Sequence, residues 1–292
     1  MNYHKGYCMN KVKLFLSALC CFAICCVRVI NADVRLPKII SDGMILQRNT
    51  NVKIWGWADA GEKISINFSG KIYSAVADTS GKWIITLEKS EAGGPYKMEI
   101  NGNNKIIIND ILFGDVWFCS GQSNMETLMS RLEDIFPQEI ATSTNPLIRE
   151  FAVPRSYDFN SPQEDVPFTK WESANSQSIK NFSAVAYFFA RELYEKYKVP
   201  IGILRSAVGG SPAEAWISED ALKEFPHYLQ IAEKYKDDSF VKKITGEDKI
   251  KLDTWYENLW KEDKGLHEEK TWHDVTYDAS DWKIMNLPAF WE

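Results

Sequence analysis

The hydrophobic pattern of this 292-residue chain changes its period near residue 113. Between residues 34 and 112 apolar and polar side chains alternate in short runs, which is typical of half-buried β-strands. After residue 113, short apolar runs alternate with segments whose apolar residues recur every three or four positions, as on one face of a helix. Strict alternation places apolar side chains on one face of a strand, whereas a spacing of three or four places them on one face of a helix. The chain must therefore combine two architectures.

The first region, residues 33–112, is predicted to be a small β-sandwich of immunoglobulin-like type. Runs such as VKIWGWA, KISINFS and KWIITLE are separated by turn residues that include Ser80-Gly81 and Asn101-Gly102. Short strands at such regular spacing are typical of sandwiches. Because the region contains no group of residues typical of catalysis, we expect it to have a structural or positioning role.

The second region, residues 113–250, is predicted to be α/β. Residues 116–119 form an apolar run before a helical pattern, Ser183 begins a strong helix to about Tyr197, and IGILRSAVGG follows as a buried strand. Alternation of strands and helices favours a parallel sheet wrapped by helices. Residues 251–292 change again, from a polar linker to a strand-and-turn pattern too short to close a core alone. We expect them to begin a further β-module.

The N-terminus has the pattern of a signal peptide. Lys11 and Lys13 precede an apolar run over residues 14–27, and Ala32 offers a small residue for cleavage. The run is short for a membrane span. Cleavage near Ala32 predicts a secreted or periplasmic protein with no stable membrane insertion.

Composition excludes several classes of function. The net charge is −6, with no basic run after residue 30, so we expect no nucleic-acid partner. Five of the six cysteines lie in the predicted signal peptide, which leaves only Cys119, expected as buried packing. The four scattered histidines give no metal-ligand cluster, and no phosphate-binding or dinucleotide motif occurs, so no metal or cofactor is expected. The sequence makes no prediction of oligomeric state.

Ser123 lies where a predicted strand meets a predicted helix, in the stretch DVWFCSGQSNMETLMSRL. Gly121 permits a tight turn, and a serine at a helix start lies beside free backbone N–H groups that favour negative charge. Ser123 could therefore be a nucleophile. The string Ser-Asn-Met-Glu also matches a capping box, in which Ser123 only caps the helix and Glu126 completes the box.

A second glycine turn follows the next predicted parallel strand, in AVGGSPAEAW. Parallel strands end at the same edge of a sheet, so this turn should lie beside Ser123. The backbone N–H groups of Ser123, Gly209 and Gly210 would then be candidates to bind an oxyanion, although a double glycine is also common in ordinary βα turns.

Two blocks of the sequence resemble the sialate O-acetylesterase family of the SGNH hydrolase superfamily. FGDVWFCSGQSNME resembles its nucleophile block and VGGSPAEAW its second block, while DGMILQR resembles its N-terminal β domain. The resemblance implies a flavodoxin-like SGNH domain with Ser123 as the nucleophile of an acetyl-enzyme mechanism. It implies Ser123 and Gly209 as oxyanion donors, and residues 251–292 as the start of an inserted jelly-roll. Candidates to line the substrate site are Gln122, Asn124 and Trp216.

The catalytic Asp and His expected from the resemblance are missing. The Asp-x-x-His pair of the family does not occur, and neither does its Asn block. His4 lies in the signal peptide, and His227, His267 and His273 lie in surface or tail contexts. We therefore expect an incomplete SGNH domain, a C-terminally truncated chain and weak activity of the 292 residues.

The leading hypothesis is a serine esterase that removes O-acetyl groups from sialic acid or a sialoglycan. One alternative is a non-catalytic carbohydrate-binding or scaffold protein with a degenerate hydrolase domain. Another is an acetylesterase of the acetylxylan or pectin type, because the sequence does not distinguish these acetyl donors.

Overall fold

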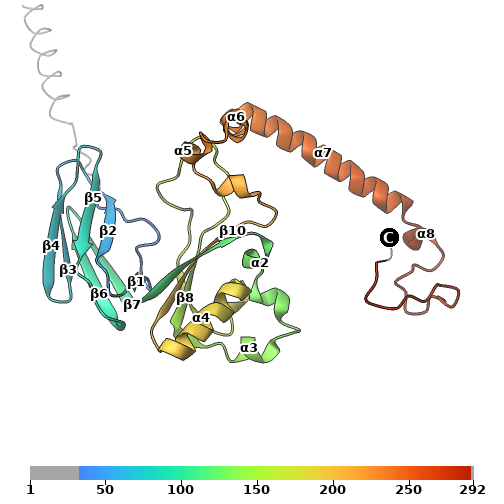
Figure 1. Cartoon of the computed structure of the whole chain (residues 1–292), viewed down its shortest axis with the longest axis horizontal. Helices are drawn as coiled ribbons and strands as arrows, with labels where there is room; N and C mark the ends of the chain where they lie inside the picture. Colours follow the sequence, from blue (N-terminus) through green and yellow to red (C-terminus); the bar gives the residue numbers. More distant parts are fainter. Residues whose placement is uncertain (1–32, 291–292) are drawn as a thin grey trace, which may run out of the picture. The chain divides into compact units, whose positions relative to one another are not determined.

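The computed structural model describes residues 33–290, which form two compact units (Figure 1). The first contains residues 33–157 and 163–211, and the second contains residues 158–162 and 212–290. The predicted signal peptide, residues 1–32, lies outside the described residues. Within residues 33–290, no helix combines the length and apolar character needed to cross a membrane.

The N-terminal part of the first unit consists of antiparallel strands around one apolar core. A sheet of order β4-β3-β6-β7 and a ribbon of β2 and β5 contribute to this core. Ile54 and Trp83 come from the ribbon, and Ile66 and Ile100 come from the sheet. The strands are β2 (Val52–Trp57), β3 (Lys63–Phe68), β4 (Lys71–Val76), β5 (Lys82–Leu87) and β6 (Gly93–Asn101). Burial alternates along β5, as the sequence pattern predicts. The immunoglobulin-like classification and the domain boundary at residue 112 stay predictions.

The long strand β7 (Lys105–Gly121) joins this part to the α/β part of the same unit (Figure 1). Its first half pairs antiparallel with β6, and its second half pairs parallel with β10 (Ile201–Ala207). β10 also pairs parallel with β8 (Asn145–Ala152), and β9 (Trp171–Ala174) closes the edge antiparallel to β8. The short β1 (Ile45–Gln47) runs parallel to β7. The result is one mixed sheet, with the predicted parallel pairing at its centre.

β7 passes from one set of partners to the other at Gly114, where there is no room for a side chain. The N–H of Asp115 donates to the carbonyl of Pro200 at 2.9 Å. A Cβ added at Gly114 would lie 2.0 Å from that carbonyl oxygen. Because the oxygen belongs to the backbone that leads into β10, it cannot move aside without shifting β10. The glycine therefore sets how closely the chain before β10 approaches β7.

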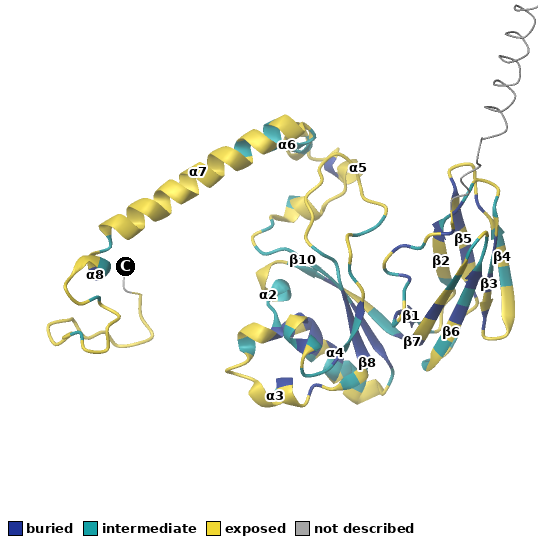
Figure 2. Ribbon diagram, turned by 180° about the vertical axis from the view of Figure 1, so that it is seen from behind, coloured by how far each residue is buried: buried dark blue, intermediate teal, exposed yellow. Residues whose placement is uncertain are grey.

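Helix α4 (Ala184–Tyr197) covers one face of the parallel strands (Figure 2). It begins at the predicted residue, because the hydroxyl of Ser183 accepts the N–H of Ala186 at 3.2 Å. Its small buried residues Ala186 and Ala190 belong to the same apolar cluster as Ile201 and Ile203 of β10. The opposite face of the sheet, which includes Phe151, packs into the N-terminal core.

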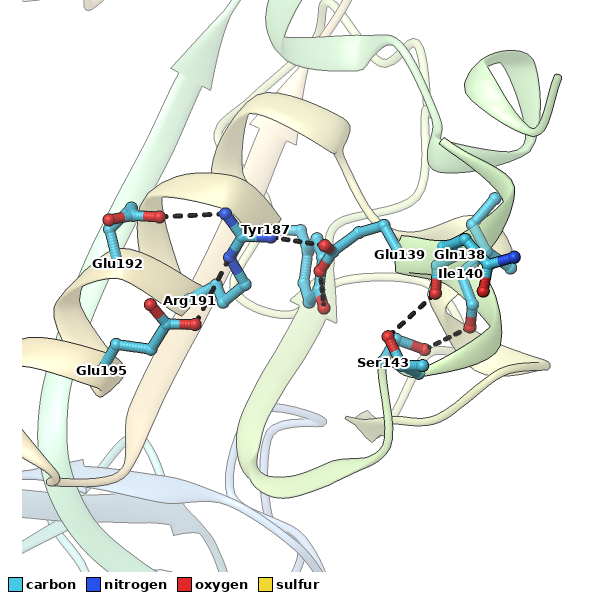
Figure 3. A network of polar contacts seen from close by, with 9 residues as sticks. Gln138, Glu139, Ile140, Ser143, Tyr187, Arg191, Glu192 and Glu195 are labelled. Carbon is cyan, nitrogen blue, oxygen red and sulfur yellow. Dashed lines mark hydrogen bonds and ion pairs between the residues drawn. The ribbon is translucent and has the colours of Figure 1, made fainter. Parts of the chain in front are cut away.

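A polar network fixes α4 to the short helix α3 (Pro137–Ala141) (Figure 3). The hydroxyl of Tyr187 donates to Glu139 at 2.8 Å, and Glu139 also pairs with Arg191. Arg191 in turn contacts Glu192 at 2.9 Å on its own helix. Burial and the hydrogen bond to Glu139 raise the pKa of Tyr187, so its hydroxyl remains a donor throughout the neutral range.

The second unit is mainly helical. Its helices are η3 (Ala213–Trp216), α5 (Glu219–Leu222), α6 (Pro226–Tyr235), α7 (Asp238–Glu262) and α8 (Lys264–His267). The carboxylate of Asp237 caps α7, which buries none of its residues (Figure 2). Residues 271–290 form turns and bends with no strand among them, so the jelly-roll start is not observed and stays a prediction.

We expect Gly114→Ala to destabilise the first unit, because the new Cβ forces apart the backbones of β7 and residue 200. Overpacking of this kind costs about 1–3 kcal/mol. Urea unfolding monitored by tryptophan fluorescence would measure the change. Gly246→Ala is the control, since nothing lies within 4 Å of a Cβ at that position in α7. Equal stability of the two variants would contradict the close-approach argument.

Candidate active site

The two predicted glycine turns lie side by side at one edge of the sheet. β7 and β10 are paired so that Gly121 is level with Ala207, the last residue of β10. The N–H of Val208 donates to the carbonyl of Gly121 at 3.0 Å, which extends the pairing into the turn. The predicted adjacency of the turns is confirmed by this register, since two parallel strands that end level bring their following loops together.

Ser123 is the first residue of the short helix α2 (Ser123–Glu126) and is exposed. Gly121 precedes it with a φ of 144°, a conformation that favours glycine. The N-cap residue is Gln122, which makes no side-chain capping bond. The capping-box interpretation is therefore wrong: Ser123 lies inside the helix, and the carboxylate of Glu126 has other partners.

The helix predicted beyond Met125 is interrupted at Thr127, where ψ is 122°. The cause is a tertiary contact, because the N–H of Ala184 donates to the carbonyl of Thr127 at 2.9 Å. Leu128 then forms a β-bridge with Ser183 before the 3-10 helix η1 (Met129–Leu132) begins. Pairing with the start of α4 thus replaces one long helix with two short ones.

The Gly209 turn is held against α2 by a carboxylate. The N–H of Gly209 donates to Oε2 of Glu126 at 2.6 Å, and Oε1 of Glu126 pairs with Arg155. A Cβ added at Gly209 would lie 2.7 Å from Oε2 of Glu126 and 3.5 Å from the Cβ of Ser123. The Gly209 N–H, together with Arg155, lowers the pKa of Glu126. In this structure, the predicted oxyanion donor Gly209 is thus already bound to an anionic oxygen.

Gln122 joins the two turns a second time. Its side-chain Nε2 donates to the carbonyl of Ser211 at 2.6 Å. Asn124 and Gly210 are exposed, and Gly210 has a φ of 76° with open space around its Cα. Trp216 belongs to the second unit, so its proposed place in the substrate site stays a prediction.

A buried ion pair lies beneath these turns. Arg205 of β10 donates from Nε to Glu150 of β8 at 2.8 Å, and the side chain of Glu150 is only 2% exposed. The second carboxylate oxygen of Glu150 accepts the N–H of Ser183 at 3.1 Å. The hydroxyl of Ser183 also contacts the sulfur of Met125 at 3.4 Å. The pair therefore links two strands to the start of α4 and to α2.

Desolvation governs the ionisable groups around this pair. Burial raises the pKa of Glu150, against the opposing effect of Arg205, and burial together with Glu150 raises the pKa of the Cys119 thiol. Cys119 is buried as predicted. A neutral buried thiol is a poor nucleophile, so Cys119 is suited to packing and not to catalysis.

The sequence pattern places Gly209 beside Ser123 but does not reveal the charged contacts around them. Glu126 fits a capping box by its spacing, whereas its partners Gly209 and Arg155 are distant in the sequence. Glu150 and Arg205 are single charged residues in otherwise apolar strands. A charge at an inward position of a buried strand needs a partner, and that is the signal in the sequence that predicts such a pair.

Among residues 33–290, the unit that carries Ser123 contains no histidine. His227, His267 and His273 all belong to the second unit. Among residues 33–290, no group of three or more His, Cys, Asp or Glu side chains is arranged to hold a metal ion.

The geometry and the comparisons together define the class of protein. Residues 113–248 match a family model described as carbohydrate esterase, sialic acid-specific acetylesterase. A carbohydrate acetylesterase from Xanthomonas citri is 37% identical, with a TM-score of 0.63 over 65% of this chain and 44% of that one. The mixed sheet with its helices is therefore an SGNH-like carbohydrate esterase fold.

Two curated relatives narrow this class of carbohydrate esterases to one family. Human and rat sialate O-acetylesterases are 29% and 30% identical over 208 residues, covering 65% of this chain. These matches support assignment of the chain to the sialate O-acetylesterase family. It spans only 40% and 38% of the length of these two relatives.

We expect the amide proton of Gly209 to report the ionisation of Glu126. Because the pKa of Glu126 is lowered, the hydrogen bond is fully formed above the ordinary pKa of Glu, about 4.3. It is lost as the pH falls through the lowered value. A pH titration by amide NMR should show this midpoint for Gly209 and lose it in Glu126→Gln. Glu133→Gln, which alters a surface pair with Lys180, is the control. An unchanged Gly209 titration in Glu126→Gln would refute the bond.

We expect Glu150→Ala to be strongly destabilising, because it leaves Arg205 without its partner in the interior. Removing one member of a buried pair costs about 3–5 kcal/mol. Chemical denaturation would measure this loss. Glu88→Ala, in the exposed pair with Lys71, should change stability little. Similar effects of both substitutions would show that the Glu150–Arg205 pair has no special structural role.

Proposed function

We propose that the chain carries the nucleophile half of a carbohydrate O-acetylesterase site, with Ser123 as the nucleophile. The substrate class is an O-acetylated sialic acid or sialoglycan, in keeping with the relatives. The observation that supports this proposal is the contact between the two turns: an exposed serine at a strand–helix junction, beside the backbone of Gly209. A nucleophile beside preorganised N–H donors is what acyl transfer from an ester requires.

In the proposed reaction, Oγ of Ser123 bonds to the carbonyl carbon of the acetyl group, and the bond from that carbon to the sugar oxygen breaks. The serine proton passes through a general base to the departing sugar hydroxyl. Water then attacks the acetyl-serine and releases acetate. The backbone N–H groups of Ser123 and Gly209, with Gly210 as a further candidate, are the proposed donors to the oxyanion.

Glu126 has to move for Gly209 to act in this way. An N–H that is bound to a carboxylate cannot also stabilise an oxyanion, because the two anions would repel each other. Arg155 already holds the other oxygen of Glu126 and is the group toward which the carboxylate can swing. We therefore include displacement of Glu126 by substrate as a step of the mechanism.

The general base is the missing component. No Asp-x-x-His pair occurs in the 292 residues, and the unit with Ser123 has no histidine among its described residues. Loss of the catalytic base lowers turnover by about six orders of magnitude in serine hydrolases. We propose that efficient hydrolysis requires this pair, and that the 292 residues alone react with an activated ester slowly.

A non-catalytic carbohydrate-binding role is the second candidate. It is favoured by one specific observation, the occupation of the Gly209 N–H by Glu126. Acetylated xylan or pectin would use the same chemistry at Ser123 and remains an alternative substrate class. In each case we propose that the protein acts after export, on the basis of the leader-like residues 1–32.

We expect p-nitrophenyl acetate to acetylate Ser123 in the 292-residue chain. Peptide mapping by mass spectrometry should find the acetyl group on the Ser123 peptide, with nitrophenol released slowly after the first equivalent. Ser123→Ala should abolish that modification, whereas Ser130→Ala, at a nearby exposed serine, should leave it unchanged. A folded chain in which Ser123 stays unmodified, while a sugar still binds, would favour the non-catalytic role.

A further inference from the structure

A pocket of about 230 Å³ opens beside the candidate active site, in the same compact unit. Its wall is formed by Glu150 and Ala152 of β8 and by Arg205 of β10. Residues 168–170, Glu172 and the pair Asn181-Phe182 complete it. The proposed mechanism uses none of these side chains.

The pocket is structurally tied to α2. Arg205 precedes Ala207 by two residues, and Ala207 is level with Gly121 at the end of β7. Asn181 and Phe182 directly precede Ser183, whose hydroxyl contacts Met125 of α2. β8 lies two strands from β7, a separation of about 10 Å at ordinary strand spacing. Arg205 is level with Cys119, four residues before Ser123, so the pocket lies behind the Ser123 turn along the sheet as well as to one side of it.

Arg205 lines the pocket and has N–H groups that the protein does not bind. Its Nε is bound to Glu150, and its Nη2 donates to the carbonyl of Asn181 at 3.3 Å. Its Nη1 donates to none of the described residues and is not sealed from solvent. Glu150 thus fixes the plane of the guanidinium while leaving N–H groups free for a planar acceptor such as a carboxylate.

The rim of the pocket adds a second cation and an aromatic surface. Lys170 has a side chain that is 66% exposed and pairs loosely with Glu172 at 3.4 Å. Phe168 is 84% exposed. Exposed aromatic rings give apolar surface against which the C–H face of a pyranose can pack. The carboxylates of the pocket, Glu150 and Glu172, equal its two cations in number. Selectivity for a ligand carboxylate must therefore come from hydrogen-bond geometry and not from net charge.

We propose that this pocket binds the sugar portion of an acidic sugar ester, with the sugar carboxylate on Nη1 of Arg205 and Lys170 and the ring against Phe168. The proposal rests on the proposed function, because it places the acidic sugar whose acetyl ester Ser123 would attack. Arg205, Lys170 and Phe168 are then specificity-determining residues, and none of them takes part in bond breaking.

Binding of the deacetylated product tests this assignment without hydrolysis. N-acetylneuraminic acid is titrated into the full chain by isothermal calorimetry and saturation-transfer NMR, with its methyl ester as the uncharged comparison. We expect saturable binding of the acid and about tenfold weaker binding of the ester, since a charge-assisted hydrogen bond is lost. Lys170→Ala should weaken binding of the acid to a similar degree, and Phe168→Ala should weaken binding of both compounds.

Matched variants separate recognition from loss of folding. Lys105→Ala removes another exposed lysine of a glutamate pair, and Ile72→Ala removes another exposed apolar side chain; both should bind like the unaltered chain. Arg205→Lys keeps a cation opposite Glu150 but removes Nη1, so it should lose binding with little change in Tm. If that variant unfolds, Lys170→Ala and Phe168→Ala still decide the question.

The outcomes distinguish the pocket from the catalytic proposal. Absence of saturable binding, equal binding of acid and ester, or equal effects of the pocket and control variants would overturn the pocket assignment. Binding that persists in Ser123→Ala supports it. Acetylation of Ser123 without sugar binding would refute the pocket assignment alone. Sugar binding without acetylation would refute only the proposed esterase chemistry.

Discussion

The parallel pairing of β7 with β10 is the constraint on which the candidate site depends. The register sets Gly121 level with Ala207, so the turns that follow both strands have to share one edge of the sheet. This pairing begins where Asp115 bonds to Pro200, next to a glycine that leaves no space for a side chain. A shift of one residue would turn every side chain of β10 to the opposite face and would also separate the two turns.

The edge of the sheet is then fixed by polar contacts between its own loops. Glu126 holds the Gly209 turn, Gln122 holds the carbonyl of Ser211, and the Glu150–Arg205 pair ties the layer below to α4. Backbone groups that leave a sheet need new partners, and here the partners come from the motif that carries Ser123. Ser123 can remain exposed because its neighbours Gln122 and Glu126 make the hydrogen bonds that hold the two turns together.

The sequence predicted those features that depend on local pattern. The change of period near residue 113 indicated β structure followed by α/β structure, Ser183 indicated the start of α4, and the two glycine turns indicated a shared edge. It failed where a distant residue decides the local conformation. The helix after Ser123 ends early because Ala184 and Ser183 bind Thr127 and Leu128, and no pattern within residues 123–132 contains that information. The partners of Glu126 were missed for the same reason.

Glu126 also indicates what the edge of the sheet is suited to bind. A carboxylate oxygen is a fair imitation of an oxyanion, and the N–H of Gly209 holds one at 2.6 Å. The same N–H is the largest cause of the lowered pKa of Glu126, so the Gly209 turn favours a negative oxygen over a neutral one. In the proposed reaction, an acetyl ester attacked by Ser123 develops just such a charge as it becomes tetrahedral. The two anions would compete for the Gly209 N–H, so under that proposal Glu126 lowers the reactivity of Ser123 until a substrate displaces the carboxylate.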